Sequence, residues 1–301
     1  MPSTLPVPLK DNLGIPKTEF ISPIPGYKTL LLGGTGTGKT YSLGRLAEIG
    51  YKVRILFLEP GQETIGKYFA DRGKPIPGNI AWHYVRPTAP SWSAMMNMAK
   101  KINTLSFKAM SELSDPDRSQ YAEFLDILGA CARFVDDRSG EVLGQVDDWG
   151  TDTVFAVDSL TGLSIAAKNL VTGAKPVVAP GEWGTAMDNL ERFLTNLCMQ
   201  HCHVVLIGHL EREVDEVSGG IQNMASTLGK KLAPKLPRFF SDVVQAKREQ
   251  ANFFWSTDSI NTDLKARNLP IQGKIADGFG IITRQWLKNG GIVENSWELK
   301  V

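Results

Sequence analysis

The sequence predicts an α/β protein built on a mostly parallel sheet, with helices on both faces and an antiparallel strand pair near the C-terminus. Two observations carry this prediction. Short apolar runs, typical of buried strands, alternate along the chain with segments of helical periodicity. A glycine-rich octapeptide at 33–40 joins the first of these strands to the first helix.

The elements follow one another in a regular order. We expect parallel strands at 27–32, 53–58, 153–157 and 204–207, helices at 39–49, 62–71 and 183–200, and the antiparallel pair at 242–247 and 252–257. The polar, glycine-containing segment 211–229 is expected to be a long loop. Residues 1–25 hold six prolines and predict an extended arm, so that 26–301 form one domain.

A helical insertion is expected around 92–150. Met95, Met98 and Ala99 stand at helical spacing, which predicts either packing into the core or an inserted helical pair. Cys198 and Cys202 lie beside two histidines at a helix end. With no second cluster nearby, this spacing favours packing over a zinc site.

The composition is that of an ordinary soluble protein, with 42% apolar and 22% charged residues and a net charge of +1. We see no apolar run of membrane length and no secretion signal, and therefore expect the cytoplasm. Three cysteines, an odd number, argue against a disulfide framework.

The small net charge conceals an asymmetry. Segment 110–160 has twelve acidic residues against three arginines, whereas 228–274 has nine basic residues against four acidic ones. The basic segment suggests contact with a polyanion, and a solvated basic face is the alternative.

Residues 33–40, GGTGTGKT, fill every fixed position of the phosphate-binding pattern G-x-x-x-x-G-K-[ST]. Glycines let backbone N–H groups converge on a phosphate at a helix N-terminus. We therefore expect ATP and Mg²⁺ at Gly33, Gly34, Thr35, Gly36, Thr37, Gly38, Lys39 and Thr40. Lys39 would reach the β- and γ-phosphates, and the Thr40 hydroxyl would be a magnesium ligand. A chance match is the alternative, which the flanking strand and helix argue against.

Acidic residues follow two of the expected strands. Asp158 ends the apolar run 154–157, where such sheets bind ligands, and we expect it to hold magnesium, oriented by Ser159. Glu59 follows strand 53–58 and is our candidate for the base that activates water. Glu63 is the second candidate, and helix capping is the other interpretation of either residue.

The order of the phosphate loop, Glu59, Val157-Asp158-Ser159 and a polar residue after strand 204–207 resembles the RecA-type ATPases. The resemblance implies that His209, where RecA has glutamine, senses the γ-phosphate and precedes a DNA-binding loop. A histidine that is merely hydrogen-bonded at a strand end is the alternative. Lys265-Ala266-Arg267 is similar to the lysine-x-arginine element by which KaiC-like and RadA-like members reach the γ-phosphate of a neighbouring subunit, and a basic surface loop is the alternative.

The narrower resemblance is to RecA-like single-strand annealing ATPases of bacteriophages, which implies a bacterial host cytoplasm. It implies a homo-oligomeric filament or ring that binds single-stranded DNA. The loop 210–229, Lys230 and Lys231 are expected to face the DNA, the loop between Leu163 and Glu182 is a second expected contact, and a single-strand-binding protein is a candidate partner. A translocating motor, such as a helicase or packaging ATPase, and a KaiC-like signalling ATPase without nucleic acid are the alternatives.

Overall fold

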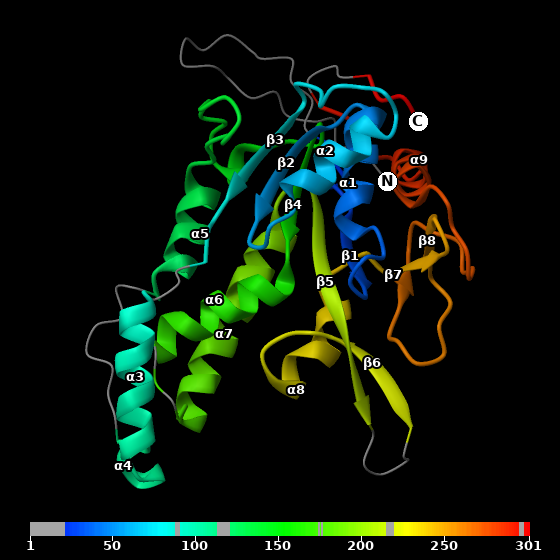
Figure 1. Ribbon diagram of the computed structural model, residues 1–301. Helices are drawn as coiled ribbons and strands as arrows, with labels where there is room; N and C mark the ends of the chain where they lie inside the picture. The colour runs from blue at the N-terminus through cyan, green and yellow to red at the C-terminus, as the bar shows by residue number, and fades with distance from the viewer. Residues whose placement is uncertain are drawn as a thin grey trace.

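A nine-stranded sheet forms the centre of the part of the molecule that the structure describes (Figure 1). This computed structural model describes residues 22–87, 91–112, 121–173, 175, 177–214, 220–294 and 298–301. Residues 1–21 of the expected arm lie outside these ranges. Among the described residues, the helices are all too short or too polar to cross a membrane.

Six neighbouring strands of the sheet are parallel, in the order β3-β2-β4-β5-β1-β7, and β8 extends the sheet antiparallel to β7. Two short antiparallel additions complete the sheet, β6 beside β5 and β9 beside β7. The strands are β1 (Lys28–Gly33), β2 (Lys52–Phe57), β3 (Ile80–Tyr84), β4 (Thr153–Asp158), β5 (His203–Val214), β6 (Ile221–Ala225), β7 (Asp242–Glu249), β8 (Asn252–Ser256) and β9 (Lys265–Ala266). The expected fold class is confirmed, including the antiparallel pair.

Helices cover both faces of the sheet (Figure 1). They are α1 (Lys39–Ile49), α2 (Gln62–Ala70), α3 (Trp92–Thr104), α4 (Phe107–Ser111), α5 (Glu123–Ala132), α6 (Leu160–Thr172), α7 (Pro180–Met199), α8 (Gly229–Leu232) and α9 (Gly278–Lys288), with 3-10 helices η2 (Val146–Asp148) and η3 (Ala233–Arg238). Alternate strand residues point to opposite faces, so β1 places Leu30 in a core with α5, α6 and α7 and Leu31 in a core with α1, α2 and α9.

The prediction of a long loop at 211–229 is wrong for most of the described residues of this segment. Strand β5 continues for 12 residues to Val214 and pairs with β6 from Leu210↔Ala225 to Val214↔Ile221. Residues 215–219, between these strands, lie outside the described part. The polar composition suggested a loop. Pairing between β5 and β6, however, satisfies the backbone hydrogen-bonding groups of both strands, so they form here without an apolar core.

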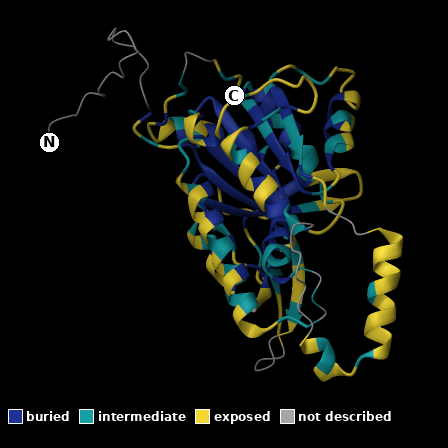
Figure 2. Ribbon diagram, turned by 90° about the vertical axis from the view of Figure 1, so that its left-hand side faces the viewer, coloured by how far each residue is buried: buried dark blue, intermediate teal, exposed yellow. Residues whose placement is uncertain are grey.

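The prediction that Met95, Met98 and Ala99 pack into the core is also wrong, because none of the α3 residues is buried. Helices α3 and α4 stand away from the body of the protein (Figures 1 and 2). The interpretation as an inserted helical pair describes them better.

Helix α9 was not expected from the sequence. Asp277 caps it by accepting a hydrogen bond from the N–H of Gly280, and Phe279, Ile282 and Trp286 are buried along one face. This cap and spacing are the signals by which the helix could have been found.

Candidate nucleotide-binding and catalytic site

The phosphate loop connects the end of β1 to the start of α1. Gly36 and Gly38 have φ angles of 75° and 82°, in the left-handed region that favours glycine. A Cβ on Gly38 would also lie 2.7 Å from the ring of Phe253 on β8. Glycine at 38 is therefore required both by the backbone turn and by the close packing of the loop against β8.

Lys39 folds back over this loop. Its side chain is buried, and Nζ donates hydrogen bonds of 2.9 and 2.8 Å to the carbonyl oxygens of Gly33 and Gly34. Burial lowers the pKa of Lys39, against the opposing effect of the carboxylates of Asp158 and Glu59. Two backbone acceptors thus hold the ammonium group inside the loop, where a phosphate group would replace them.

Asp158 and Thr40 meet where β4 ends and α1 begins. Thr40 Oγ1 donates a 2.5 Å hydrogen bond to Oδ2 of Asp158, whose side chain is buried. Burial raises the pKa of Asp158 to about 6, although the hydrogen bond from Thr40 lowers it. The carboxylate is therefore costly to hold as an anion unless a cation is nearby.

These two oxygen groups fit a magnesium ion. Mg²⁺ prefers oxygen ligands and is commonly held by one or two protein groups together with water and substrate phosphates. No cluster of three or more histidine, cysteine or acidic residues that could hold a metal occurs among the described residues. Thr40 and Asp158 therefore suit a metal that arrives with a nucleotide.

Glu59 lies just beyond β2 and is held at both carboxylate oxygens. Ser159 Oγ donates a 2.5 Å hydrogen bond to Oε1, and Nε2 of His209 lies 3.3 Å from Oε2. The contact with His209 is the largest cause that lowers the pKa of Glu59, and the Ser159 hydrogen bond adds to it, while burial opposes both. Glu63 stands exposed in the first turn of α2.

Strand pairing explains why these residues meet. The carboxyl ends of parallel strands lie along one edge of the sheet, and there Gly33 pairs with His209 and Phe57 with Asp158. This edge holds the phosphate loop after β1, Glu59 after β2, Asp158 at the end of β4, and His209 in β5. The structure thus brings these expected site residues together.

Lys265 and Arg267 do not lie at this edge in the same chain. Lys265 pairs with Val243 near the start of β7. The last residues of β1, which lead into the phosphate loop, pair instead with the middle of β7. Lys265 Nζ donates hydrogen bonds to the carbonyl oxygens of Pro237 and Phe240, at 3.2 and 2.7 Å. Arg267 is exposed, so its expected role toward a neighbouring subunit stays a prediction.

The two lysines expected to contact DNA belong to α8. Lys231 is exposed and has no ion-pair partner among the described residues. The side chain of Lys230 lies outside the described part of the structure. Other bases of segment 228–274 are engaged: Lys235 and Arg238 contact Glu191, and Lys274 contacts Glu249.

Beside the phosphate loop lies an open pocket of about 720 Å³ that the sequence did not reveal. Gly38, Tyr41, Arg248 and Phe253 line it on the side of the loop. The rings of Tyr41 and Phe253 are 5.4 Å apart, and the Arg248 guanidinium lies 5.6 Å from the Phe253 ring centroid. The sequence signal for this pocket was the pairing of Arg248 with Phe253 in the β7–β8 hairpin. That pairing does not by itself show that the hairpin lies beside the phosphate loop, which is far away in the sequence.

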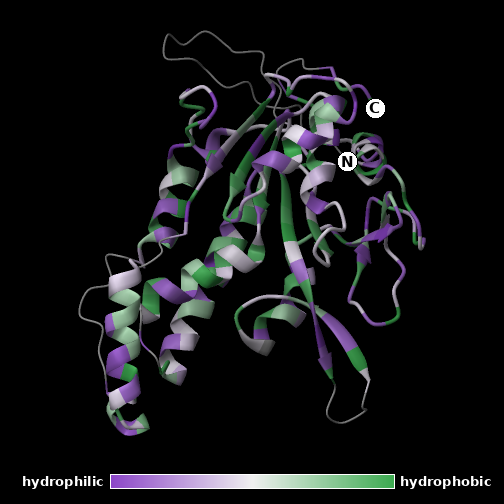
Figure 3. Ribbon diagram, in the orientation of Figure 1, coloured by the Kyte–Doolittle hydropathy of each residue, from purple (hydrophilic) through white to green (hydrophobic). Residues whose placement is uncertain are grey.

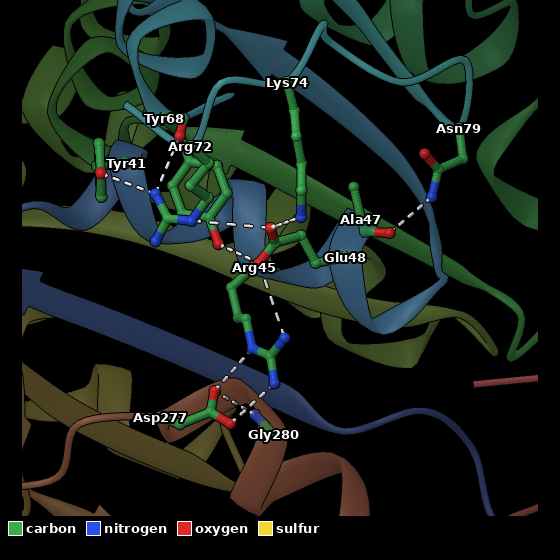
Figure 4. Close-up of polar contacts among 10 residues, drawn as sticks. All are labelled: Tyr41, Arg45, Ala47, Glu48, Tyr68, Arg72, Lys74, Asn79, Asp277 and Gly280. Atoms are coloured by element: carbon green, nitrogen blue, oxygen red, sulfur yellow. Dashed lines mark hydrogen bonds and ion pairs between the residues drawn. The ribbon is translucent and has the colours of Figure 1, made fainter. Parts of the chain in front are cut away.

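A network of charged side chains forms the far wall of this pocket and joins α1, α2 and α9 (Figure 4). Arg45 of α1 donates two hydrogen bonds of 3.1 Å to the carboxylate of Asp277, the N-cap of α9. Glu48 accepts hydrogen bonds from Tyr68 and Lys74, at 2.7 and 3.2 Å.

Arg72 completes the same network from beyond the end of α2. Its guanidinium lies 3.6 Å from the centroid of the Tyr68 ring and donates a 2.9 Å hydrogen bond to the Tyr41 hydroxyl (Figure 4). Paired and stacked arginines of this kind fix the positions of neighbouring rings. Tyr41 is thereby oriented at the border between the phosphate loop and the pocket.

The chain matches a solved structure weakly and one protein family over most of its length. It shares 16% identity with a solved structure of a prototypical ATPase from the type III secretion system of pathogenic bacteria, with a TM-score of 0.36, over 74% of this chain and 52% of that one. The chain thus spans about half the length of that protein, and the likeness is too low to carry an argument. No curated protein matches the chain. The family described as "AAA domain" matches residues 25–269, and the chain therefore belongs to this family of ATPase domains.

Proposed function

We propose that this protein is a magnesium-dependent ATPase that binds single-stranded DNA, assembles into a filament or ring, and acts in recombination or strand annealing. An ATPase domain of the AAA kind follows from the family match. The meeting of Lys39, Thr40, Glu59 and Asp158 at one edge of the sheet supports magnesium-dependent hydrolysis. The excess of basic residues in segment 228–274 supports the DNA part of the proposal.

Each residue has a part in hydrolysis. Lys39 would exchange its two carbonyl partners for oxygens of the β- and γ-phosphates, and Thr40 and Asp158 would hold magnesium. Bound magnesium would neutralise charge that develops on the phosphate oxygens. Glu59, an anion at neutral pH, would orient a water molecule and accept its proton, while Ser159 and His209 hold the carboxylate in place.

The pocket beside the loop supports a nucleotide with a planar base. Tyr41 and Phe253 offer rings next to Gly38, at the end of the loop from which a ribose and base would extend. Aromatic rings and a guanidinium provide stacking surfaces for such a base. We therefore propose that the adenine lies against Tyr41 and Phe253.

The DNA contact is proposed for α8 and not for the β5–β6 hairpin. Segment 210–229 contains four acidic residues and one arginine, which would repel a polyanion. Lys230 and Lys231 follow directly, and exposed lysines at this place would neutralise backbone phosphates. The loop expected between Leu163 and Glu182 is helical over most of its described residues, which belong to α6 up to Thr172 and to α7 from Pro180. This segment stays the proposed second contact, and a single-strand-binding partner remains part of this proposal.

Salt dependence tests the DNA contact. Binding of single strands in the presence of ATP should weaken steeply as salt rises, and replacing Lys230 and Lys231 with alanine should flatten that dependence while nucleotide affinity stays unchanged. The matched control replaces Lys288 and Lys300, two exposed lysines near the C-terminus. Equal binding by the wild type and the Lys230/Lys231 variant would remove DNA from this segment.

Two assays separate the alternative functions. A translocating motor would unwind a duplex with a single-stranded overhang, which an annealing protein does not require. A signalling ATPase would hydrolyse ATP at the same rate with and without single-stranded DNA. Stimulated hydrolysis without unwinding is the outcome expected for the proposed function.

A further inference from the structure

An apolar groove of about 390 Å³ lies between α5 and α7, on the face of the sheet opposite α1, α2 and α9. Its apolar lining consists of Phe124, Leu128, Cys131, Phe193 and Leu197. The rings of Phe124 and Phe193 are 6.1 Å apart. Leu128, at the edge, is 43% exposed among the described residues. Because burial of a large apolar side chain contributes about 1.5–3 kcal/mol, a segment that covered this lining would be held there.

Amide side chains surround the apolar lining. Asn189, Asn196 and Gln200 lie on the side of α7 that also carries Phe193, because these positions are spaced at three and four along the helix. Hydrophobic and hydrophilic segments both appear along α5 and α7 (Figure 3). Amides can both donate to and accept from a peptide backbone. A polyproline II segment has no internal hydrogen bonds, and such segments dock in grooves lined by aromatic rings. The groove therefore fits an apolar, proline-rich segment.

This chain contains such a segment near its N-terminus. Residues 5–9 read Leu-Pro-Val-Pro-Leu, so apolar side chains alternate with prolines, a pattern that predicts polyproline II. They belong to residues 1–21, which lie outside the described part of the structure. Segment 113–120, just before α5, lies outside it too, but its one large apolar residue is Leu113. Segment 5–9 is therefore the better match for the groove.

The described chain begins beside the groove. One oxygen of Glu294 accepts a 2.9 Å hydrogen bond from the N–H of Ser22 and lies 2.8 Å from Nε2 of His201. The carbonyl oxygen of His201 also accepts a 2.8 Å hydrogen bond from the N–H of Gly26. His201 directly follows Gln200, which lines the groove. The N-terminal segment thus starts from this end of the groove.

The length of the connecting chain suits this position. Twelve residues, 10–21, separate segment 5–9 from Ser22. A flexible linker of that length spans about 17–21 Å on average. The groove follows α7 from Gln200 back to Asn189, which is about 17 Å at 1.5 Å per residue. Segment 5–9 can therefore reach the whole groove of its own chain.

We propose that segment 5–9 docks in the α5/α7 groove of its own chain. Its apolar side chains lie against Phe124 and Phe193, and its backbone carbonyl groups accept hydrogen bonds from the amides around the lining. Because the linker keeps the segment at a high local concentration, a contact of modest strength is sufficient. This inference does not depend on ATP hydrolysis, DNA binding or assembly.

A pair of introduced cysteines tests the docking in the full chain. Val7→Cys and Leu128→Cys together place one thiol in segment 5–9 and one at the edge of the groove. Oxidation with copper phenanthroline should join them within one chain, at a rate independent of protein concentration, because a disulfide requires Cα atoms about 4.4–6.8 Å apart. Peptide mass spectrometry identifies the bond, and a bond from position 7 to the native Cys131 of the groove supports docking equally.

The matched control combines Val7→Cys with Ala70→Cys, an exposed position of α2 on the opposite face of the sheet. We expect the groove pair to form its disulfide at least about tenfold faster than this control, since only docking brings the thiols together. Equal rates for the two pairs would overturn the proposal. A groove disulfide that forms only between two chains would also overturn it and would assign the groove to the N-terminal segment of a second copy.

Hydrogen exchange gives a second measurement that needs no cysteine. Replacing Leu5, Val7 and Leu9 with aspartate should speed exchange in peptides from α5 and α7, because the groove loses its cover. The control replaces Lys10, Asp11 and Asn12 with serine, which leaves the apolar residues in place, and should exchange like the wild type. Unchanged exchange in the aspartate variant would contradict the docking.

Discussion

The hydroxyl of Ser159 donates a hydrogen bond of 2.5 Å to the carboxylate of Glu59, across the gap between the ends of β4 and β2. Ser159 directly follows Asp158, so one strand end supplies both the acidic residue that contacts Thr40 and the group that orients Glu59. The second Glu59 oxygen faces His209, at the level where β5 passes the phosphate loop. The expected base is thus positioned from two neighbouring strands.

Replacing Glu59 with glutamine should leave ATP binding intact and slow hydrolysis by a factor of about 10²–10⁴, because only proton transfer and water orientation are lost. Nucleotide titration and single-turnover phosphate release measure the two steps separately. Glu63→Gln, four residues away on exposed α2, is the matched control and should hydrolyse ATP normally. If Glu63→Gln shows the slow phenotype and Glu59→Gln does not, Glu63 is the base.

His209→Ala should move the acid limb of the pH–rate profile upward. The contact with His209 is the largest cause that lowers the pKa of Glu59, so its removal raises that pKa and protonates the base at a higher pH. His209→Gln retains a hydrogen-bond donor and should move the limb less. A limb that stays in place in His209→Ala would show that the histidine has no influence on the base.

Mixing subunits tests the expected role of Arg267 toward a neighbour. Lys39→Ala and Arg267→Ala should each be inactive alone, and their mixture should regain activity, since a mixed interface combines an intact loop with an intact arginine. Co-assembly is verified by labelling one variant. Activity that never exceeds the sum of the separate variants would assign Arg267 to the surface.

Stability should fall as the pH drops below 6.5 because of His203. This buried ring accepts a hydrogen bond from the Tyr27 N–H at Nδ1, and Nε2 faces the carbonyl oxygen of Thr151 at 2.9 Å. A second ring proton would face the Tyr27 N–H, and burial lowers the pKa of His203 well below 6.5. The unfolded chain therefore takes up this proton first, at a cost to stability of up to about 1.4 kcal/mol per pH unit.

Urea unfolding between pH 7 and pH 5 measures this effect. His203→Gln keeps an acceptor and a donor but does not titrate, so its stability should vary less with pH over the same window. Parallel pH profiles for the wild type and His203→Gln would contradict the assignment.

The sequence was sufficient to predict β1, β2, β4, the core part of β5 and the β7–β8 pair, because these strands are apolar or alternating runs and Glu59 and Asp158 directly follow two of them. Strands β3 and β9 were not expected. Contacts between distant segments could not be predicted. Nothing near Phe253 in the sequence indicates that its ring packs on Gly38, and nothing in the sequence of α3 indicates that none of its residues is buried. The β5–β6 hairpin was missed because pairing on a solvated extension requires no apolar run.

Phosphate release by the wild type and Lys39→Ala, purified identically and shown by circular dichroism to be equally folded, tests the central claim most directly. Lys39 is the one side chain of the loop whose ammonium group would bridge the β- and γ-phosphates. We predict magnesium-dependent release by the wild type and near-complete loss in Lys39→Ala. Equal rates for the two proteins would contradict the assignment of this edge of the sheet as an ATPase site.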